Sequence, residues 1–218
     1  MKKIAIIGAG GFGREIKTLI DDINASNSTF ELIGFFDDNI ENGTIINNLP
    51  VIGDIASINE IDYELSLALG IGVPNVKEKI IKSIYNKKLL FPVLIHPSVV
   101  MSKDDIEIGE GSVICASNIL TCNIKLKKFI TLNLCCTVGH DTIIEDYSSF
   151  MPSVNISGEV KIKRKVYVGT GAKIINQLSI GENTVVGAGA VVSKSLPANC
   201  TAVGIPAKPI KFKVKHEK

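Results

Sequence analysis

The sequence of 218 residues lacks tryptophan altogether, and only 6% of its residues are aromatic. Its five cysteines include no C-x-x-C pair, and four of them lie in aliphatic surroundings. This pattern favours free thiols in a reducing compartment over a disulfide framework. No apolar run approaches the roughly 20 residues that a helix needs to span a bilayer. The net charge is only +2, without the basic and aromatic clusters that bind nucleic acid. We therefore expect a cytoplasmic protein that binds neither membranes nor nucleic acid.

The amino-terminal segment imitates a secretory signal, because two lysines precede an apolar run in MKKIAIIGAGG. The run stops at Gly8 after only four residues, which is too short for the apolar region of a signal peptide. We therefore expect this segment to be part of the folded protein.

The first part of the chain, residues 1–95, alternates strand-like and helix-like segments. Apolar runs typical of buried strands occur in KIAIIGAG, FELIGFFDD and ELSLALGIG. Helical spacing of apolar residues follows the first and third runs, in FGREIKTLIDDI and NVKEKIIKSIY. This order predicts a Rossmann-like α/β domain, in which helices cover a small parallel sheet.

Residues 96–218 follow a different rhythm, in which every sixth residue from 108 to 192 is large and apolar. In such a unit, two residues point inward from a short strand and two others turn a corner. Three units then close a triangular coil of eighteen residues. A sandwich of ordinary strands would instead alternate every two residues, with irregular turns. The sequence therefore predicts an all-β solenoid. Its core column is formed by Ile108, Ile114, Leu120, Leu126, Leu132, Val138, Ile144, Phe150, Ile156, Ile162, Val168, Ile174, Ile180, Val186 and Val192.

The hexads IGEGSV, IGENTV and VGAGAV, with AVGIPAKPI closing the last coil, resemble the hexapeptide-repeat acyltransferases. Together with IAIIGAGGFGREI, FFDD, IHPSVVMSKDDIEIGEGSVI and TVGHD, they make the whole chain similar to sugar N- and O-acetyltransferases of the NeuD/PglD type. The resemblance implies a left-handed parallel β-helix, acetyl-CoA as co-substrate and no metal. It also implies a homotrimer with active sites between protomers.

One histidine of the solenoid is the candidate catalytic residue. In the six-residue repeat Val138 points inward, whereas His140 and Asp141 occupy a corner of the triangular coil and project away from it. A solvated corner is the alternative interpretation. In the family that the chain resembles, a histidine here is the general base for the attacking sugar, and the acid beside it orients the ring.

The resemblance also assigns residues of the solenoid to acetyl-CoA. Gly158 resembles the donor to the thioester oxyanion, although a tight corner without a Cβ is the alternative. Ser149 stands where related sequences often carry a second histidine. Lys208 is expected to meet a CoA phosphate, and a solvated lysine near the terminus is the alternative. Asn133 resembles a polar residue that lines the same cleft as the histidine. The predicted cofactor-binding residues are Asn133, Ser149, Gly158, Gly171, Gly189 and Lys208.

The glycine-rich segment from Gly8 to Gly13 follows a strand and opens a helix, which suits an anion at a helix N-terminus. Asp37, 24 residues beyond Gly13, lies near the ribose position of a dinucleotide fold. Only three strands precede the solenoid, however, and the resemblance implies a nucleotide-sugar, commonly UDP-linked. Phe12 departs from relatives that have histidine there, and a structural turn without ligand is the alternative. The predicted substrate-binding residues are Gly10, Gly11, Phe12, Gly13, Asp37, Asp38 and Gly72.

The favoured function is an acetyl-CoA-dependent N-acetyltransferase that acts on a nucleotide-linked amino-sugar of the UDP-4-amino-sugar type, for glycan or polysaccharide biosynthesis. An O-acetyltransferase for sialic acid or a related sugar is the alternative, because it uses the same parts. A β-helix metal hydratase would need several imidazoles around zinc, whereas the repeats contain one histidine. A non-catalytic nucleotide-binding or scaffold protein is the third class.

Overall fold

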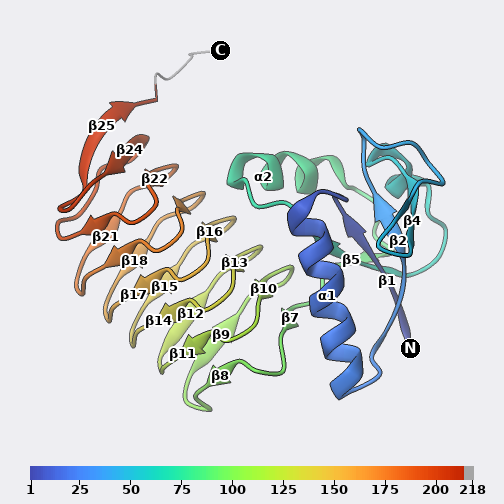
Figure 1. Cartoon of the computed structure of the whole chain (residues 1–218), viewed down its shortest axis with the longest axis horizontal. Coiled ribbons are helices and arrows are strands. Elements are labelled where there is room, and N and C mark those ends of the chain that lie inside the picture. Colours follow the sequence, from blue (N-terminus) through green and yellow to red (C-terminus); the bar gives the residue numbers. More distant parts are fainter. Residues whose placement is uncertain (214–218) are drawn as a thin grey trace. The chain divides into compact units, whose positions relative to one another are not determined.

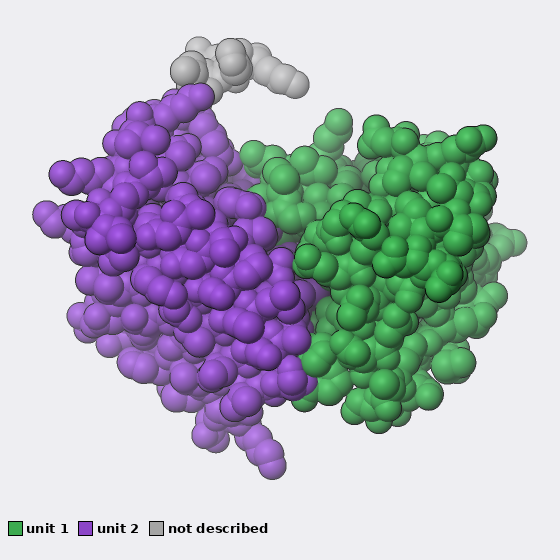
Figure 2. Space-filling model, in the orientation of Figure 1, with its two compact units in different colours: residues 1–97 green, residues 98–218 purple. Residues whose placement is uncertain are grey.

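The computed structural model describes residues 1–213, which form two compact units (Figure 2). The first unit comprises Met1–Pro97, and the second begins at Ser98. This division falls two residues after the expected one between residues 95 and 96, and residues 214–218 of the expected second domain lie outside the described part. No helix within residues 1–213 is long and apolar enough to cross a membrane.

The first unit is built around a mostly parallel sheet with strand order β3-β4-β2-β1-β5-β6 (Figure 1). Helix α1 (Gly11–Ser26) follows β1 and contacts β1, β2 and β7, and α2 (Pro74–Ser83) follows β5. The unit also contains a short 3-10 helix at Ala56–Glu60. The strands are β1 (Lys2–Ile7), β2 (Phe30–Phe36), β3 (Ile45–Ile46), β4 (Leu49–Gly53), β5 (Leu65–Leu69), β6 (Leu89–Leu90) and β7 (Leu94–Ile95).

The three strands and two helices predicted for this unit correspond to β1, β2, β5, α1 and α2. Strands β3, β4, β6 and β7 were not predicted, and β7 lies in a segment that was expected to be a connector. Three of them are only two residues long, and β4 contains Pro50, which weakens any strand signal in a sequence.

Helix α1 begins close to the sheet because glycine removes two clashes. A Cβ on Gly13 would lie 1.8 Å from the carbonyl oxygen of Gly8, and a Cβ on Gly70 would lie 2.7 Å from the Cα of Gly13. The glycine loop therefore sits directly against the carboxyl ends of β1 and β5, the edge where open α/β sheets bind ligands.

The second unit is a β-solenoid whose strands stack in three sheets, here called faces 1, 2 and 3 (Figure 1). Neighbouring solenoid strands on a face are parallel and mostly eighteen residues apart, as in the pairing of Thr137 with Asn155. The spacing is 19 residues between Val100 and Ile119 and 16 between Val185 and Thr201. A final antiparallel strand, β25, closes face 1. Face 1 contains β10 (Val113–Ile114), β13 (Thr131–Leu132), β16 (Ser149–Phe150), β19 (Tyr167–Val168), β22 (Val185–Val186), β24 (Cys200–Val203) and β25 (Lys208–Phe212). Face 2 contains β8 (Val100–Met101), β11 (Ile119–Leu120), β14 (Thr137–Val138), β17 (Asn155–Ile156), β20 (Lys173–Ile174) and β23 (Val191–Val192). Face 3 contains β9 (Ile106–Ile108), β12 (Ile124–Leu126), β15 (Ile143–Ile144), β18 (Lys161–Ile162) and β21 (Ser179–Ile180).

The core of the solenoid is the predicted apolar column. Fourteen of its fifteen side chains are buried, and only Ile108, on the first strand of face 3, is half-buried. Burying a large aliphatic side chain contributes about 1.5–3 kcal/mol, so the column is the main source of stability in this unit. The prediction of a six-residue solenoid is confirmed.

All five cysteines are free. Cys115, Cys136 and Cys200 are buried, Cys122 is half-buried and Cys135 is exposed. Burial raises the pKa of the Cys136 thiol to about 11, so this side chain packs as a small apolar group.

Candidate active site

His140 lies on the edge of the prism where the chain turns from face 2 to face 3, here called edge 2–3. The residues of this edge in successive coils are 121–123, 139–141, 157–159 and 175–177. The side chains of His140 and Asp141 are 54% and 51% exposed, and the ring Nδ1 lies 2.7 Å from Oδ2 of Asp141. A carboxylate only accepts hydrogen bonds, so Nδ1 carries the hydrogen and Nε2 keeps a lone pair. The arrangement is that of an oriented general base.

Asn123 completes this pair from the preceding coil. Its Nδ2 donates to Oδ1 of Asp141 at 3.1 Å, so both oxygens of the acid are engaged. The hydrogen bonds from His140 and then Asn123 lower the pKa of Asp141 below its usual range. The sequence analysis missed Asn123. Its position eighteen residues before Asp141, the length of one coil, is the signal that would have found it.

We expect Asn123→Ala to lower kcat about three- to tenfold, because one hydrogen bond that fixes the acid, worth about 0.5–1.5 kcal/mol, is lost. Steady-state acetyl transfer measures this change. Asn176→Ala, in the edge position of His140 two coils further along, is the matched control and should keep the wild-type rate. Equal rates for wild type and Asn123→Ala would show that Asp141 needs no second partner.

Gly158 lies one coil after His140 on the same edge. A Cβ at this position would lie 2.4 Å from Nε2 and 2.5 Å from Cε1 of the ring, so the imidazole packs directly on the glycine. Within residues 1–213 the N–H of Gly158 has no hydrogen-bond acceptor, as is also true of the equivalent Cys122 and Asn176. The free N–H is thus a property of the corner, and only at Gly158 does an imidazole lie against it.

An open groove of about 620 Å³ begins at Asp141 and follows edge 2–3. Its lining includes Glu159 and Gln177 from the next two coils, with Ser179 and Ser195 beside them. The carboxylate of Asp141, the partner of His140, therefore borders a space that can receive a ligand.

The structure places the other predicted cofactor-binding residues elsewhere. Asn133, Gly171 and Gly189 lie where the chain turns from face 1 to face 2, here called edge 1–2. The two glycines have φ values of 72° and 65°, and no atom lies within 4 Å of an added Cβ, so this edge is smooth and open there. The expectation that Asn133 lines the same cleft as His140 is therefore not met within one chain, because the two residues lie on different edges of face 2.

None of the three polar side chains among these predicted residues meets His140. Asn133 is only 5% exposed, and its Oδ1 accepts the N–H of Leu134 at 2.7 Å. Ser149 is fully buried on face 1, where its Oγ has no partner in the described part of the chain. Lys208 is exposed on β25. The six-residue repeat could not reveal the burial of Asn133 and Ser149. It gives the face or edge on which a residue lies, but not what packs over its side chain.

The first unit contains a second candidate site at the carboxyl ends of its strands. The N–H groups of Gly11, Phe12 and Gly13 have no acceptor in the described part of the chain, as expected at the first turn of α1. Such N–H groups favour an anion.

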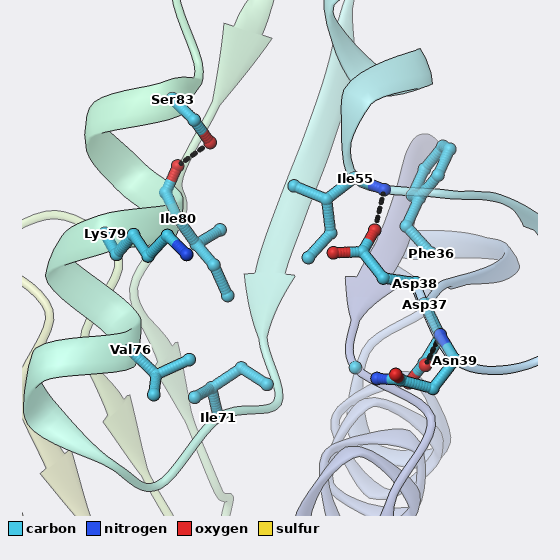
Figure 3. Close-up of a pocket in the computed structure, with 11 residues that line it drawn as sticks. Phe36, Asp37, Asp38, Asn39, Ile55, Ile71, Val76, Lys79, Ile80 and Ser83 are labelled. Carbon is cyan, nitrogen blue, oxygen red and sulfur yellow. Dashed lines mark hydrogen bonds between the residues drawn. The ribbon is translucent and has the colours of Figure 1, made fainter.

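A cavity of about 270 Å³ lies between the end of β2 and helix α2 (Figure 3). Of the predicted substrate-binding residues, Asp37 and Asp38 line it, whereas Gly10, Gly11, Phe12, Gly13 and Gly72 do not. The glycine loop therefore borders the cavity through Gly8, at its first residue, and not through the residues that begin α1.

The two acids after β2 differ in what they offer a ligand. Asp37 accepts the N–H groups of Ala9 at 2.8 Å and Asn39 at 2.9 Å, so its carboxylate ties the glycine loop to the end of β2. Asp38 uses one oxygen for the N–H of Ile55, at 2.8 Å, and its second oxygen has no partner within residues 1–213. Asp38 therefore keeps more of its accepting capacity for a ligand than Asp37 does.

Comparison with known proteins relates both units to one group. The PglD N-terminal domain family matches residues 3–84. GDP-perosamine N-acetyltransferase from Escherichia coli O157:H7 is 28% identical over 217 residues, which cover 97% of each chain. The acetyltransferase domain of PglB from Neisseria gonorrhoeae FA1090, in complex with acetyl coenzyme A, is 31% identical with a TM-score of 0.88 and covers 96% of this chain and 99% of its own.

A histidine variant of perosamine N-acetyltransferase from Caulobacter crescentus, in complex with CoA and GDP-perosamine, is 26% identical with a TM-score of 0.85. The match covers 97% of this chain and 98% of that one. These similarities confirm the predicted fold, an α/β domain followed by a left-handed parallel β-helix.

Proposed function

Because the chain belongs to the NeuD/PglD-type hexapeptide-repeat sugar acetyltransferases, we propose that it moves an acetyl group from acetyl-CoA to the amine of a nucleotide-linked amino-sugar. The enzyme class follows from the family: it is an acyltransferase with acetyl-CoA as co-substrate. The relative that acts on GDP-perosamine matches over both units, which supports a nucleotide-linked acceptor. It also favours the amine over the hydroxyl of sialic acid.

The observation that carries the mechanism is the imidazole of His140, which is held by Asp141 and packed on Gly158. The sugar nitrogen attacks the thioester carbonyl and forms the C–N bond. The N–H of Gly158 stabilises the oxyanion, and the intermediate collapses as the C–S bond breaks. Nε2 takes the proton from the nitrogen and returns it to the departing CoA thiolate. Asp141 stabilises the transient imidazolium.

The positions of the two edges support a site shared between copies of the chain. The predicted base lies on edge 2–3 and the open glycines lie on edge 1–2, at opposite borders of face 2. A cyclic homotrimer joins unlike surfaces of neighbouring copies, so edge 2–3 of one copy can meet edge 1–2 of the next. Each active site would then lie between two protomers.

A substrate panel tests the proposed function. Purified protein is assayed with acetyl-CoA and UDP- or GDP-linked 4-amino-4,6-dideoxy sugars, with free sialic acid in a parallel reaction, and thiol release is followed. We expect rapid release with a nucleotide-linked amino-sugar of the UDP-4-amino type or its GDP counterpart. Release with sialic acid alone would replace the proposal by O-acetylation, and background rates throughout would reject both.

A further inference from the structure

Glu159 follows Gly158 on edge 2–3 and lies one coil after Asp141. The two acids occupy the same corner position, with φ values of 57° for Asp141 and 59° for Glu159, and both line the groove that begins at Asp141. The N–H of Glu159 donates to the carbonyl oxygen of His140 at 2.7 Å. Because strands of successive coils lie about 4.8 Å apart, Glu159 is one coil away from the pair that contains the predicted base.

The carboxylate of Glu159 differs from those of the other solenoid glutamates in its partners. Within residues 1–213 it has no cationic partner, and its two oxygens accept only the amide Nε2 of Gln177, at 3.2 and 3.3 Å. The other four glutamates of residues 98–213 all form ion pairs. These pairs are Glu107 with Lys125, Glu110 with Lys128, Glu145 with Lys163, and Glu182 with Arg164 and Lys165. Glu159 thus keeps an uncompensated negative charge beside the candidate active site.

Two other charged side chains line the same groove. Asp141 is already hydrogen-bonded to the imidazole and to Asn123. Lys161, on β18, makes no ion pair with Glu159 or with any other acid of the described residues, although it lies in the lining. The remaining lining residues are uncharged, namely Gln177, Leu178, Ser179 and Ser195. The groove therefore carries two negative charges and one positive charge, and the charge of Glu159 is available to a ligand.

We propose that Glu159 is a specificity-determining residue, which binds the ammonium form of the amino-sugar and so favours an amine acceptor over a hydroxyl. This inference rests on the proposed function, because it presumes an acceptor amine at His140. An aliphatic amine is largely protonated near neutral pH, whereas a hydroxyl is neutral. A carboxylate without a cation in the protein can form an ion pair with the ammonium, but it can form only a weaker hydrogen bond with a hydroxyl.

The ion pair acts on binding and not on the chemical step. The bound ammonium must lose a proton to solvent before its nitrogen can attack, and the neutral amine then follows the steps described for His140. Because Glu159 stabilises the ground-state complex, it lowers KM without raising kcat. The same negative charge repels the phosphates of the ligand, so it also orients the amine end of the sugar toward the imidazole.

A steady-state kinetic comparison of wild type and Glu159→Gln tests the inference, with a UDP- or GDP-linked 4-amino-4,6-dideoxy sugar as acceptor. Glutamine keeps the size of the side chain and one accepting oxygen but removes the charge. We expect the KM for the amino-sugar to rise about three- to fivefold, the usual effect of an exposed ion pair. The kcat and the KM for acetyl-CoA should stay within about twofold of wild type. Added salt should raise the KM for the amino-sugar more steeply in wild type than in the variant.

A neutral ligand separates charge from shape. The same nucleotide-sugar with a hydroxyl in place of the amine, used as a competitive inhibitor, should bind wild type and Glu159→Gln equally well. Weaker binding of this inhibitor to the variant would mean that Glu159 does not distinguish an amine from a hydroxyl, and the inference would be wrong.

Glu145→Gln is the matched control, because it removes the same charge from the edge between faces 3 and 1, where Glu145 pairs with Lys163. It should leave both KM values unchanged. Lys161→Met removes the cation from the groove and should lower the KM for the amino-sugar, whereas a rise would mean that the groove binds phosphate and would contradict the inference. If Glu159→Gln keeps the wild-type KM for the amino-sugar, or raises the KM for acetyl-CoA instead, the inference is wrong and the proposed function stands. If wild type acetylates no nucleotide-linked amine, the proposed function fails as well.

Discussion

His140→Asn should lower kcat/KM for acetyl transfer by about 10²–10⁴-fold, the usual contribution of a positioned general base. Asparagine keeps a polar side chain at the corner but has no lone-pair nitrogen to take the proton from the attacking amine. The ring is half-exposed and belongs to no core cluster, so the melting temperature should stay within about 2 °C of wild type. Steady-state kinetics and thermal melts on the same preparation separate the two effects.

The pH dependence sharpens this test. The pKa of Asp141 is lowered from 3.8, so this carboxylate stays ionised at every pH above that value and cannot cause a loss of rate between pH 8 and 5. A fall in the wild-type rate across this range that His140→Asn lacks would therefore arise at His140 and not at Asp141. Equal wild-type and variant rates would reject catalysis by His140 and support the scaffold alternative.

The solenoid was predictable because each of its units is local. Each unit of six residues contains its own inward-facing residue and its own turn. The period of the sequence is therefore also the period of the structure. Val138 is fully buried and His140 exposed two residues later, as the six-residue repeat requires. The same repeat assigns each residue to a face or an edge, so it puts Asn133 and His140 at opposite borders of face 2 within one chain. The prediction that both residues line one cleft then requires two copies of the chain.

The pocket of the first unit was less predictable, because its parts are distant in the sequence. Asp37 had the spacing of a ribose-binding acid, yet its carboxylate is occupied by the N–H of Ala9, 28 residues away. Lys79 was not among the predicted site residues, and only the fold places it in the lining of the same cavity as Asp38. Hydrogen bonds and cavities between separate elements leave no period in a single sequence, whereas helices and strands do.

Gly158→Ala should lower kcat about 100-fold while leaving the fold intact. The added Cβ would lie 2.4 Å from Nε2 of His140, closer than real contacts allow, so the ring must turn away from its catalytic position. Displacement of a catalytic group by about 1 Å can cost 10²-fold in rate. The atoms that must move belong to an exposed side chain rather than to the backbone, so stability should change by less than about 1 kcal/mol.

Gly139→Ala gives the contrasting case for stability, because its Cβ would lie 2.5 Å from the backbone nitrogen of Gly158 and 2.6 Å from the carbonyl carbon of Ser157. Backbone cannot turn aside, so this variant should lose about 1–3 kcal/mol of stability. A double variant completes the argument: once His140→Asn has removed the base, Gly158→Ala should add only the smaller loss that comes from a disturbed oxyanion donor. If the double variant loses the product of the two single-variant decreases in kcat, Gly158 acts independently of the imidazole. If Gly158→Ala alone keeps wild-type activity, the ring works from another position.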